Sequence, residues 1–287
     1  MKILLTRISA FLFCFMICAC NNEKITVYHT WNSLKKMNYA ENVQPLSEEI
    51  IPYDFFPWAG IVSHHILAHE YIDAWFHRLS MMRKPKTFFI ISPDHNKLSL
   101  MPYSLTTGSW DSGFGLVESD TKKVKEFSRL LDVDTDERVF EYEHGICDLM
   151  PYIKKHFPQS KVVAIIISGD SEVNTKTCNL LADILEKEFK NKRKQDNFLI
   201  ISSDFSHKGD LKETFINDSK SEQYLRNVAQ VPWNIVNCDN RAGIYIFNRI
   251  RKIETESVIL YNKNSWEISG QGEDDITSYF FVYFGEK

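Results

Sequence analysis

Residues 87–95 read Thr-Phe-Phe-Ile-Ile-Ser-Pro-Asp-His, an apolar run that stops at a turn and a histidine. Short apolar runs bounded by turn residues are typical of strands buried on both faces of a parallel sheet. Two other segments follow this pattern. Residues 59–64 end on a histidine, and residues 198–207 place an aspartate and a histidine after their apolar run. Because the carboxyl ends of strands in an open α/β sheet line one edge, where ligands bind, we expect these polar side chains to gather there.

The rest of the chain alternates between apolar runs and stretches of helical periodicity, which is typical of βαβ units. We expect strands at 59–62, 87–92, 103–107, 161–167, 198–203, 257–261 and 276–284, and helices at 66–79, 121–131, 144–156, 174–190, 218–229 and 239–253. Pro151 should kink or split the helix that contains it. The sequence therefore predicts an α/β fold with a single domain, in which helices cover both faces of a mostly parallel mixed sheet.

The composition is that of an ordinary globular protein, with 287 residues, 44% hydrophobic and 25% charged. A formal net charge of −4 gives no reason to expect a nucleic-acid partner. The P-loop, GxGxxG, GxSxG and HExxH motifs do not occur in the sequence. Nucleotide binding, lipase-type chemistry and zincin proteolysis therefore have no sequence support. The expected partner is a small molecule or a peptide at the strand edge.

The N-terminus has the pattern of a targeting segment. Lys2 and Arg7 supply positive charge around an apolar stretch, residues 8–18, which is shorter than the roughly 20 residues that span a bilayer. The stretch ends in Ile-Cys-Ala-Cys at 17–20, followed by two asparagines. This resembles a bacterial lipoprotein signal, in which Cys20 is lipidated and becomes the new N-terminus. The alternative is an ordinary secretory signal, with Cys20 incidental.

Three segments follow from this interpretation: a lipoprotein signal peptide at 1–19, a tether and entry segment at 20–50, and an α/β domain at 51–287. The mature protein is then extracytoplasmic and anchored by lipid to a bacterial cell membrane, with no other membrane contact expected. It keeps Cys147, Cys178 and Cys238, an odd number, so at least one is unpaired. Whether Cys147 and Cys178 pair is left open.

Several residues at the strand ends could carry chemistry. His64 and His65 are neighbours whose side chains diverge, so only one can face the edge. His95 follows a Pro-Asp turn, and Asp94 could orient an imidazole. Asp204 directly follows a strand, and three residues suffice to bring His207 back over it. Such a pair suits an oriented general base or a mixed metal shell.

Two segments outside these strands add further candidates. Cys238 stands before a predicted helix, whose N-terminus favours a thiolate, the form that binds metals. Asp239 is the expected N-cap of that helix, or a carboxylate ligand if Cys238 turns away. Glu143 is an expected helix cap or first-turn charge, and His144 can point toward the same edge.

Together, these segments resemble the MEMO family, the B component of the AmmeMemoRadiSam set, which is related in fold to class III extradiol dioxygenases. The resemblance covers about residues 60–284 and rests on Gly60-Ile61-Val62-Ser63-His64-His65, Ser92-Pro93-Asp94-His95, Glu143-His144-Gly145-Ile146, Ser202-Ser203-Asp204-Phe205-Ser206-His207 and Cys238. The chain departs from the family pattern at Ser63, where proline is common, and at Cys147, where glutamate is common.

The resemblance implies that His64, His95 and Cys238 bind a redox metal, iron or copper. It also implies that His207 acts as an acid/base group with Asp204, and we expect His144 beside them in the outer shell. The dioxygenases use a carboxylate as third ligand, a place that Cys238 or Asp239 must fill here.

We therefore expect a metal-dependent redox protein, including a dioxygenase-like enzyme. Two alternatives stay open: a non-catalytic module that binds a peptide or small ligand, and an extracytoplasmic protein that sequesters metal. All three depend on folding that gathers His64, His95, His207 and Cys238 into one pocket.

Overall fold

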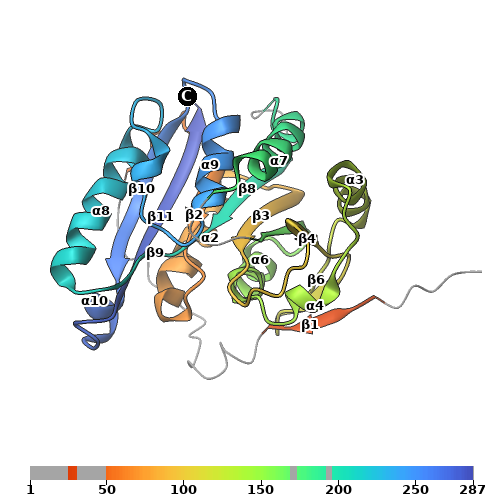
Figure 1. The fold of residues 1–287 in the computed structure, drawn as a ribbon, viewed down its shortest axis with the longest axis horizontal. Coiled ribbons are helices and arrows are strands. Elements are labelled where there is room, and N and C mark those ends of the chain that lie inside the picture. The colour runs from red at the N-terminus through yellow and green to blue at the C-terminus, as the bar shows by residue number, and fades with distance from the viewer. Residues whose placement is uncertain (1–24, 31–49, 169–172, 192–195, 287) are drawn as a thin grey trace, which may run out of the picture.

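A computed structural model describes residues 25–30, 50–168, 173–191 and 196–286 of the chain. Its main sheet has the strand order β10-β11-β2-β8-β3-β7-β4, and β9 pairs with β11 beside this path. The strands β2, β8, β3 and β7 run parallel to one another, while β4, β9, β10 and β11 add antiparallel pairings. Helices cover both faces (Figure 1). The predicted single α/β domain is confirmed.

The elements have the following bounds. The strands are β1 Val27–His29, β2 Phe56–Val62, β3 Thr87–Pro93, β4 Tyr103–Leu105, β5 Ser109–Asp111, β6 Leu116–Val117, β7 Lys161–Ile167, β8 Asn197–Ser202, β9 Phe205–Gly209, β10 Glu256–Asn264 and β11 Ile276–Glu286. The helices are η1 Ile66–Ala68, α2 His69–Met82, α3 Thr121–Leu131, α4 Glu137–Phe140, α5 His144–Cys147, α6 Met150–His156, α7 Thr175–Glu188, α8 Leu211–Arg226, η2 Trp233–Ile235, α9 Arg241–Ile250 and α10 Ser265–Ser269.

The apolar runs are continuous because the central strands are buried on both faces. Along β3, Phe89 and Ile91 pack into one core with α3, α7 and α9, while Phe88 and Ile90 pack into a second core with α2 and α6. Successive side chains of a strand point to opposite faces, so one strand serves both cores.

Parallel register brings the ends of three strands to one edge. Val62 of β2 lies opposite Ser202 of β8, and Ile91 of β3 lies opposite Ile201 of β8. The residues that follow β2, β3 and β8 therefore emerge side by side, as the sequence pattern predicts.

The helix expected over 144–156 is divided into α5 and α6, and the expected split at Pro151 is confirmed, because Pro151 occupies the first turn of α6, where its missing N–H costs no hydrogen bond. Two other expectations about elements were wrong. Helix α8 begins seven residues before the expected 218, at an N-cap where the Asp210 side chain accepts a hydrogen bond from the Glu213 N–H. Strand β9, whose sequence Phe-Ser-His-Lys-Gly is mostly polar, was not expected at all.

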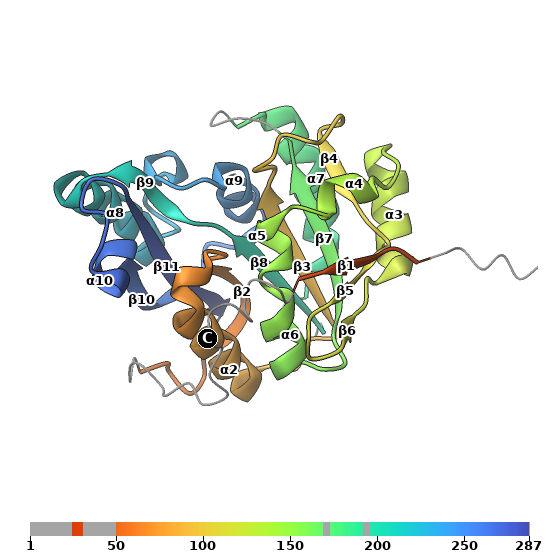
Figure 2. The same ribbon diagram turned by 90° about the horizontal axis from the view of Figure 1, so that it is seen from below.

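A small second sheet has the order β1-β5-β6, with β1 parallel to β5. Figure 2 shows that it lies away from the end of the molecule formed by α8 and β10. Its first strand falls within the 20–50 segment that was expected to be a tether. Cys20 and the signal segment lie outside the described residues.

The structure adds two observations about cysteines and membrane spans. Cys147, Cys178 and Cys238 are all buried and free, so Cys147 and Cys178 do not pair. Within the described ranges, none of the helices combines the length and the apolarity that crossing a bilayer would require.

A substitution at Gly60 of β2 tests how closely β2 packs against β11 and Trp75. A Cβ at this position would lie 2.6 Å from the Val282 carbonyl oxygen of β11 and 2.6 Å from a ring carbon of Trp75. We expect Gly60→Ala to lower the free energy of unfolding by about 1–3 kcal/mol, because the backbone of β11 has to move. Chemical denaturation checks this, and an unchanged midpoint would show that β2 and β11 have room to separate.

Candidate functional site

Two imidazoles meet at the common edge of the parallel strands. His64 follows β2 and His95 follows β3, and their ring centroids are 4.7 Å apart. His64 is buried, whereas the side chain of His95 is 20% exposed. His65, the neighbour of His64, turns away and stacks on Tyr279, where its Nδ1 lies 2.8 Å from the tyrosine hydroxyl. The prediction that only one of the two adjacent histidines faces the edge is confirmed.

The Nδ1 side of His64 is fixed by a serine. Ser202, the last residue of β8, donates its hydroxyl hydrogen to the Gly145 carbonyl oxygen at 2.5 Å. A hydroxyl has only one hydrogen, so its oxygen must accept from His64 Nδ1, which lies 3.0 Å away. This network assigns the proton of a neutral His64 ring to Nδ1 and leaves a lone pair on Nε2.

The Nδ1 side of His95 is fixed by a carboxylate. Glu143 Oε1 lies 2.5 Å from His95 Nδ1 and accepts from the Gly145 N–H at 2.9 Å, while its Oε2 accepts from the His95 N–H. Glu143 also caps α5, as expected. Carboxylates can only accept, and the contact with Glu143 is shorter than the 3.3 Å between His95 Nε2 and Asp239, so a neutral His95 ring carries its proton on Nδ1, and a charged ring also carries one on Nε2.

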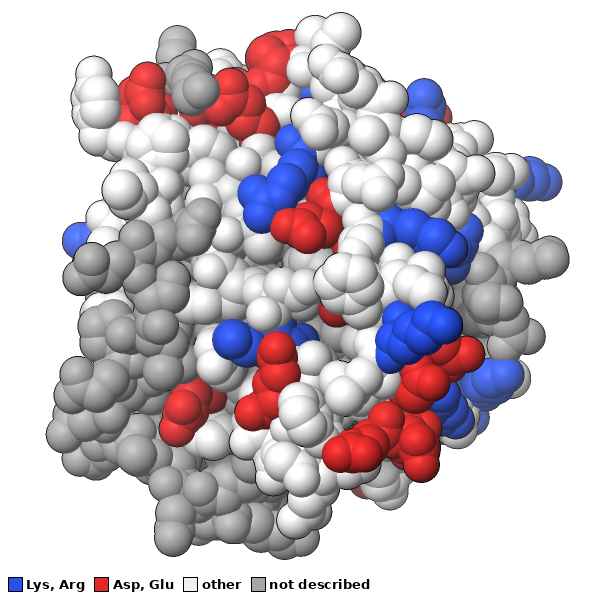
Figure 3. Space-filling view, turned by 90° about the vertical axis from the view of Figure 1, so that its left-hand side faces the viewer, with Lys and Arg blue, Asp and Glu red and all other residues white. Residues whose placement is uncertain are grey.

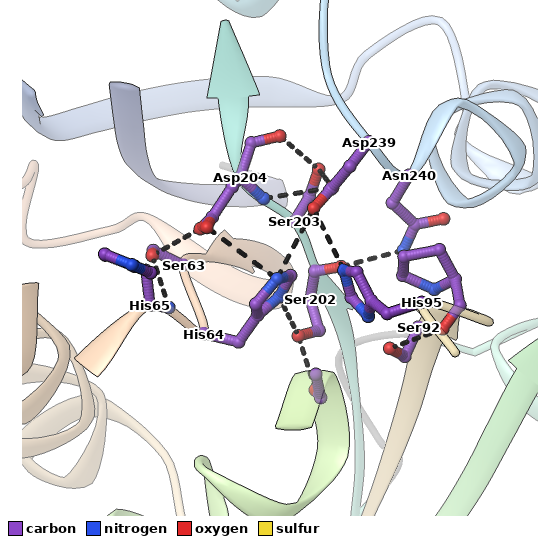
Figure 4. Close-up of polar contacts among 12 residues, drawn as sticks. Ser63, His64, His65, Ser92, His95, Ser202, Ser203, Asp204, Asp239 and Asn240 are labelled. Atoms are coloured by element: carbon purple, nitrogen blue, oxygen red, sulfur yellow. Dashed lines mark hydrogen bonds and ion pairs between the residues drawn. The ribbon is translucent and has the colours of Figure 1, made fainter. Parts of the chain in front are cut away.

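Both Nε2 atoms point at one oxygen of Asp239. The Asp239 Oδ2 atom is 3.4 Å from His64 Nε2 and 3.3 Å from His95 Nε2 (Figure 4). The other oxygen, Oδ1, accepts from the Ser203 hydroxyl at 2.8 Å and from the Asp204 N–H at 3.0 Å. One oxygen therefore holds the carboxylate in place, and the other faces the imidazoles.

The expectation that Asp239 caps the following helix was wrong. The N-cap of α9 is Asn240, whose Oδ1 accepts from the Gly243 N–H. Its amide nitrogen donates to the carbonyl oxygens of Ile91 and Ser202, both at 2.9 Å. Asn240 thus ties the start of α9 to the ends of β3 and β8, and this leaves the Asp239 side chain free to turn into the site.

Cys238 takes a different position from the one expected for a ligand. It is buried in the core beside α9, and burial raises the pKa of its thiol to about 12. Desolvation thus outweighs the helix N-terminus and disfavours the expected thiolate, and the ligand role of Cys238 stays a prediction. Among the described residues, the candidate ligand groups are His64 with His95 and His144, and His64 with Asp204 and Asp239. Asp239 occupies the place considered for Cys238.

His144 joins the two imidazoles, as expected. Its ring centroid is 4.1 Å from that of His95 and 5.1 Å from that of His64, and its side chain is 45% exposed. Burial, together with the charges of His64 and His95, lowers the pKa of His144 to about 4. His144 is therefore a neutral base at the open side of the cluster.

Asp204 and His207 both lie at the site, but they do not form the expected pair. The Ser63 hydroxyl donates to Asp204 Oδ1 at 2.5 Å, and Asp204 Oδ2 lies 3.7 Å from His64 Nε2. His207, on β9, has its Nε2 atom 3.7 Å from Asp239 Oδ2. The carboxylate that His207 faces is therefore Asp239, because β9 carries the imidazole past Asp204.

Asp94 does not orient an imidazole. Its carboxylate accepts from the N–H groups of Leu98 and Ser99 and so closes its own loop. Sequence analysis gave no role to Ser202 or Ser203, although both stand in the motif that precedes Asp204. A serine after a buried strand signals a loop, and only the fold reveals which imidazole or carboxylate it contacts.

The donor set fits a metal cation. Without a cation or an added proton, two Nε2 lone pairs would face a carboxylate oxygen across less than 3.5 Å. Burial acts to lower the pKa of His95, but hydrogen bonds to Asp239 and Glu143 outweigh it and raise the pKa to about 10. Burial acts to raise the pKa of Asp239, but the three imidazoles hold it well below its usual value. The site thus attracts positive charge at the point where the three atoms converge.

Comparison with known proteins identifies the family of this chain. The sequence model of the family described as Memo-like protein matches residues 36–271. A MEMO1 family protein from Caldivirga maquilingensis is 26% identical over 189 residues, which make up 65% of this chain and 62% of that protein. Another from Sulfolobus acidocaldarius is 23% identical over 248 residues, 83% of this chain and 82% of that protein. Because the family match extends over most of its length, this chain belongs to the Memo-like protein family.

Proposed function

We propose that the protein is a metal-dependent redox protein built on a mononuclear centre held by His64, His95 and Asp239, a set that combines residues of the two candidate groups. The observation that carries the proposal is the convergence of two Nε2 atoms on Asp239 Oδ2, at 3.4 and 3.3 Å. The Nδ1 atom of each imidazole is engaged by Ser202 or Glu143, as is usual for histidines that bind metals.

Two histidines and one carboxylate are the ligands typical of non-haem iron(II) sites that keep open positions. Copper(I) prefers soft sulfur ligands, whereas Cys238 lies in the core and belongs to neither candidate ligand group. We therefore propose iron rather than copper. The family is related in fold to class III extradiol dioxygenases. Bound iron would supply one-electron and oxygen chemistry.

The chain's own residues would handle protons around the metal. His144 is 45% exposed and its pKa is lowered to about 4, so at neutral pH its ring is uncharged and can accept a hydrogen bond from a ligand that enters on its side. His207 lies 3.7 Å from Asp239 and has a side chain that is 41% exposed, so it can pass a proton between the site and water. Asp204, held by Ser63, supplies negative charge beside the buried ring of His64.

The proposed ligand is a small molecule or peptide that reaches the metal on the side of His144 and His207. The N-terminal pattern that ends at Cys20 supports a further part of the proposal: an extracytoplasmic protein held by lipid to a bacterial membrane. Binding without turnover and metal sequestration are the competing functions, and oxygen uptake by iron-loaded protein with a catechol or a reductant separates them from a redox role.

Asp239 and Cys238 offer a matched test of the ligand set. We expect Asp239→Asn to lose most bound iron, because it removes the charge while keeping the shape. We expect Cys238→Ser to retain it, because the thiol lies in the core. Elemental analysis of anaerobically purified protein, with circular dichroism as the folding control, measures both.

The opposite pattern of metal content in these two variants would contradict the proposal. If Cys238→Ser loses its metal and Asp239→Asn keeps it, the thiol is the ligand, and the proposed carboxylate centre is wrong.

A substitution at Gly145 tests whether the contacts of Glu143 position the His95 ring. A Cβ there would lie 2.2 Å from Ser92 Oγ, 3.0 Å from Glu143 Oε1 and 3.2 Å from a ring carbon of His95. We expect Gly145→Ala to weaken metal affinity by about 10–100-fold, because the His95 ring must move. Metal titration measures this, and an unchanged affinity would show that the Glu143 contact does not position His95.

The pH dependence of metal binding follows from the raised pKa of His95. Its pKa is about 10, so at neutral pH an entering metal must displace a proton. Affinity should therefore increase with pH, on the order of tenfold per pH unit for each proton released. Titration with zinc as a redox-silent probe checks this from mildly acidic to mildly basic pH. An affinity independent of pH would mean that His95 binds the metal without losing a proton.

A further inference from the structure

The outer face of the small sheet at the N-terminus carries exposed apolar side chains around the ion pair of His29 and Asp111, whose Nδ1 and Oδ2 atoms lie 3.4 Å apart. Val27 of β1 and Leu116 of β6 are exposed, while Tyr28, Trp110 and Val117 fill the buried side. Ile25, before β1, and Phe114, at the tip of the turn between β5 and β6, are exposed as well. We call these four residues, Ile25, Val27, Phe114 and Leu116, the N-terminal apolar face.

The strand that carries this face is firmly joined to the body. Tyr28 is buried, and its hydroxyl hydrogen-bonds with Thr106 and Glu137. Backbone hydrogen bonds flank β1 on both sides, from the Ser109 N–H to the Thr26 carbonyl oxygen and from the Thr30 N–H to the Asp111 carbonyl oxygen. The chain is therefore fixed to the domain over residues 26–30.

The proposed lipid anchor leaves little free chain before this point. Only residues 21–24 separate Cys20 from Ile25. Even fully extended, five residue steps reach about 18 Å. A lipid on Cys20 would thus hold β1 close to the bilayer surface, whereas a free segment over all of residues 20–50 would let the domain turn in any direction.

We propose that the N-terminal apolar face lies on the membrane surface and orients the domain there. This inference rests on the proposed lipid anchor and adds the surface that meets the lipid. Phe and Leu side chains suit the boundary between headgroups and acyl chains. Lys154 lies beside the same turn, with its Cε 3.1 Å from where a Cβ on Gly115 would stand, and its charge favours anionic headgroups.

The opposite end of the molecule provides a control position. Phe215 of α8 is 73% exposed, compared with 49% for Phe114. Helix α8 lies at the far end of the molecule from β1 in both ribbon views (Figures 1 and 2). On the face that includes this end, positive and negative side chains are interspersed with uncharged ones, so neither sign of charge dominates (Figure 3).

The test uses the full, processed protein in vesicles of phosphatidylethanolamine and phosphatidylglycerol. Phe114→Cys and Phe215→Cys are each labelled with a fluorophore, and unsubstituted protein controls for labelling of the three buried cysteines. Nitroxide lipid should quench the label at 114 several-fold more than the label at 215, and iodide in water should show the reverse. Mass spectrometry of the N-terminal peptide reports separately whether Cys20 carries lipid.

The outcomes distinguish the two proposals. Equal quenching at both positions, with Cys20 lipidated, would overturn the membrane-facing surface and leave the anchor intact. Shielding of position 114 from iodide without quenching by nitroxide lipid would show that a protein covers the face, and would also overturn the proposal. An unmodified Cys20 would overturn both.

Discussion

The site depends on one electrostatic constraint: two imidazole nitrogens and a carboxylate oxygen point at the same small volume. Each of these groups also makes a hydrogen bond on the side that faces away from this volume, so none can turn away without breaking that bond. Ser202 holds His64, Glu143 holds His95, and Ser203 with the Asp204 N–H holds Asp239. Such an arrangement is stable only when positive charge occupies the centre, either as protons on the rings or as a metal ion.

The backbone of Gly145 helps to position both imidazoles through hydrogen bonds to Glu143 and Ser202. Its N–H donates to Glu143, which accepts the Nδ1 proton of His95, and its carbonyl oxygen accepts from Ser202, which in turn accepts the Nδ1 proton of His64. A side chain there would force its neighbours to move, because a Cβ would lie 2.2 Å from Ser92 Oγ. One short helix, α5, therefore sets the tautomers of two histidines that come from different strands.

The fold and half of the site could be predicted because burial on both faces of a sheet leaves a clear apolar pattern. The runs at 87–92, 161–167 and 198–203 gave strands β3, β7 and β8 nearly to the residue, and parallel pairing then placed His64 and His95 together. Strand β9 was missed because it is short and mostly polar, and its pairing with β11 comes from tertiary contact. The partner of His207 was missed for the same reason, since the path of β9 decides which carboxylate it meets.

The choice between Cys238 and Asp239 could not be made from sequence, because neighbouring side chains diverge and either could face the site. Asn240 determines which of the two faces the site. Its amide group ties the start of α9 to β3 and β8, and this fixes the orientation of the chain at Cys238 and Asp239. The result keeps the thiol in the core and turns the Asp239 carboxylate toward the two imidazoles. This has a chemical consequence for the proposed extracytoplasmic iron centre. A thiolate beside a redox metal is open to oxidation, whereas a carboxylate is not, so in that centre the rotation of one residue would protect the ligand set.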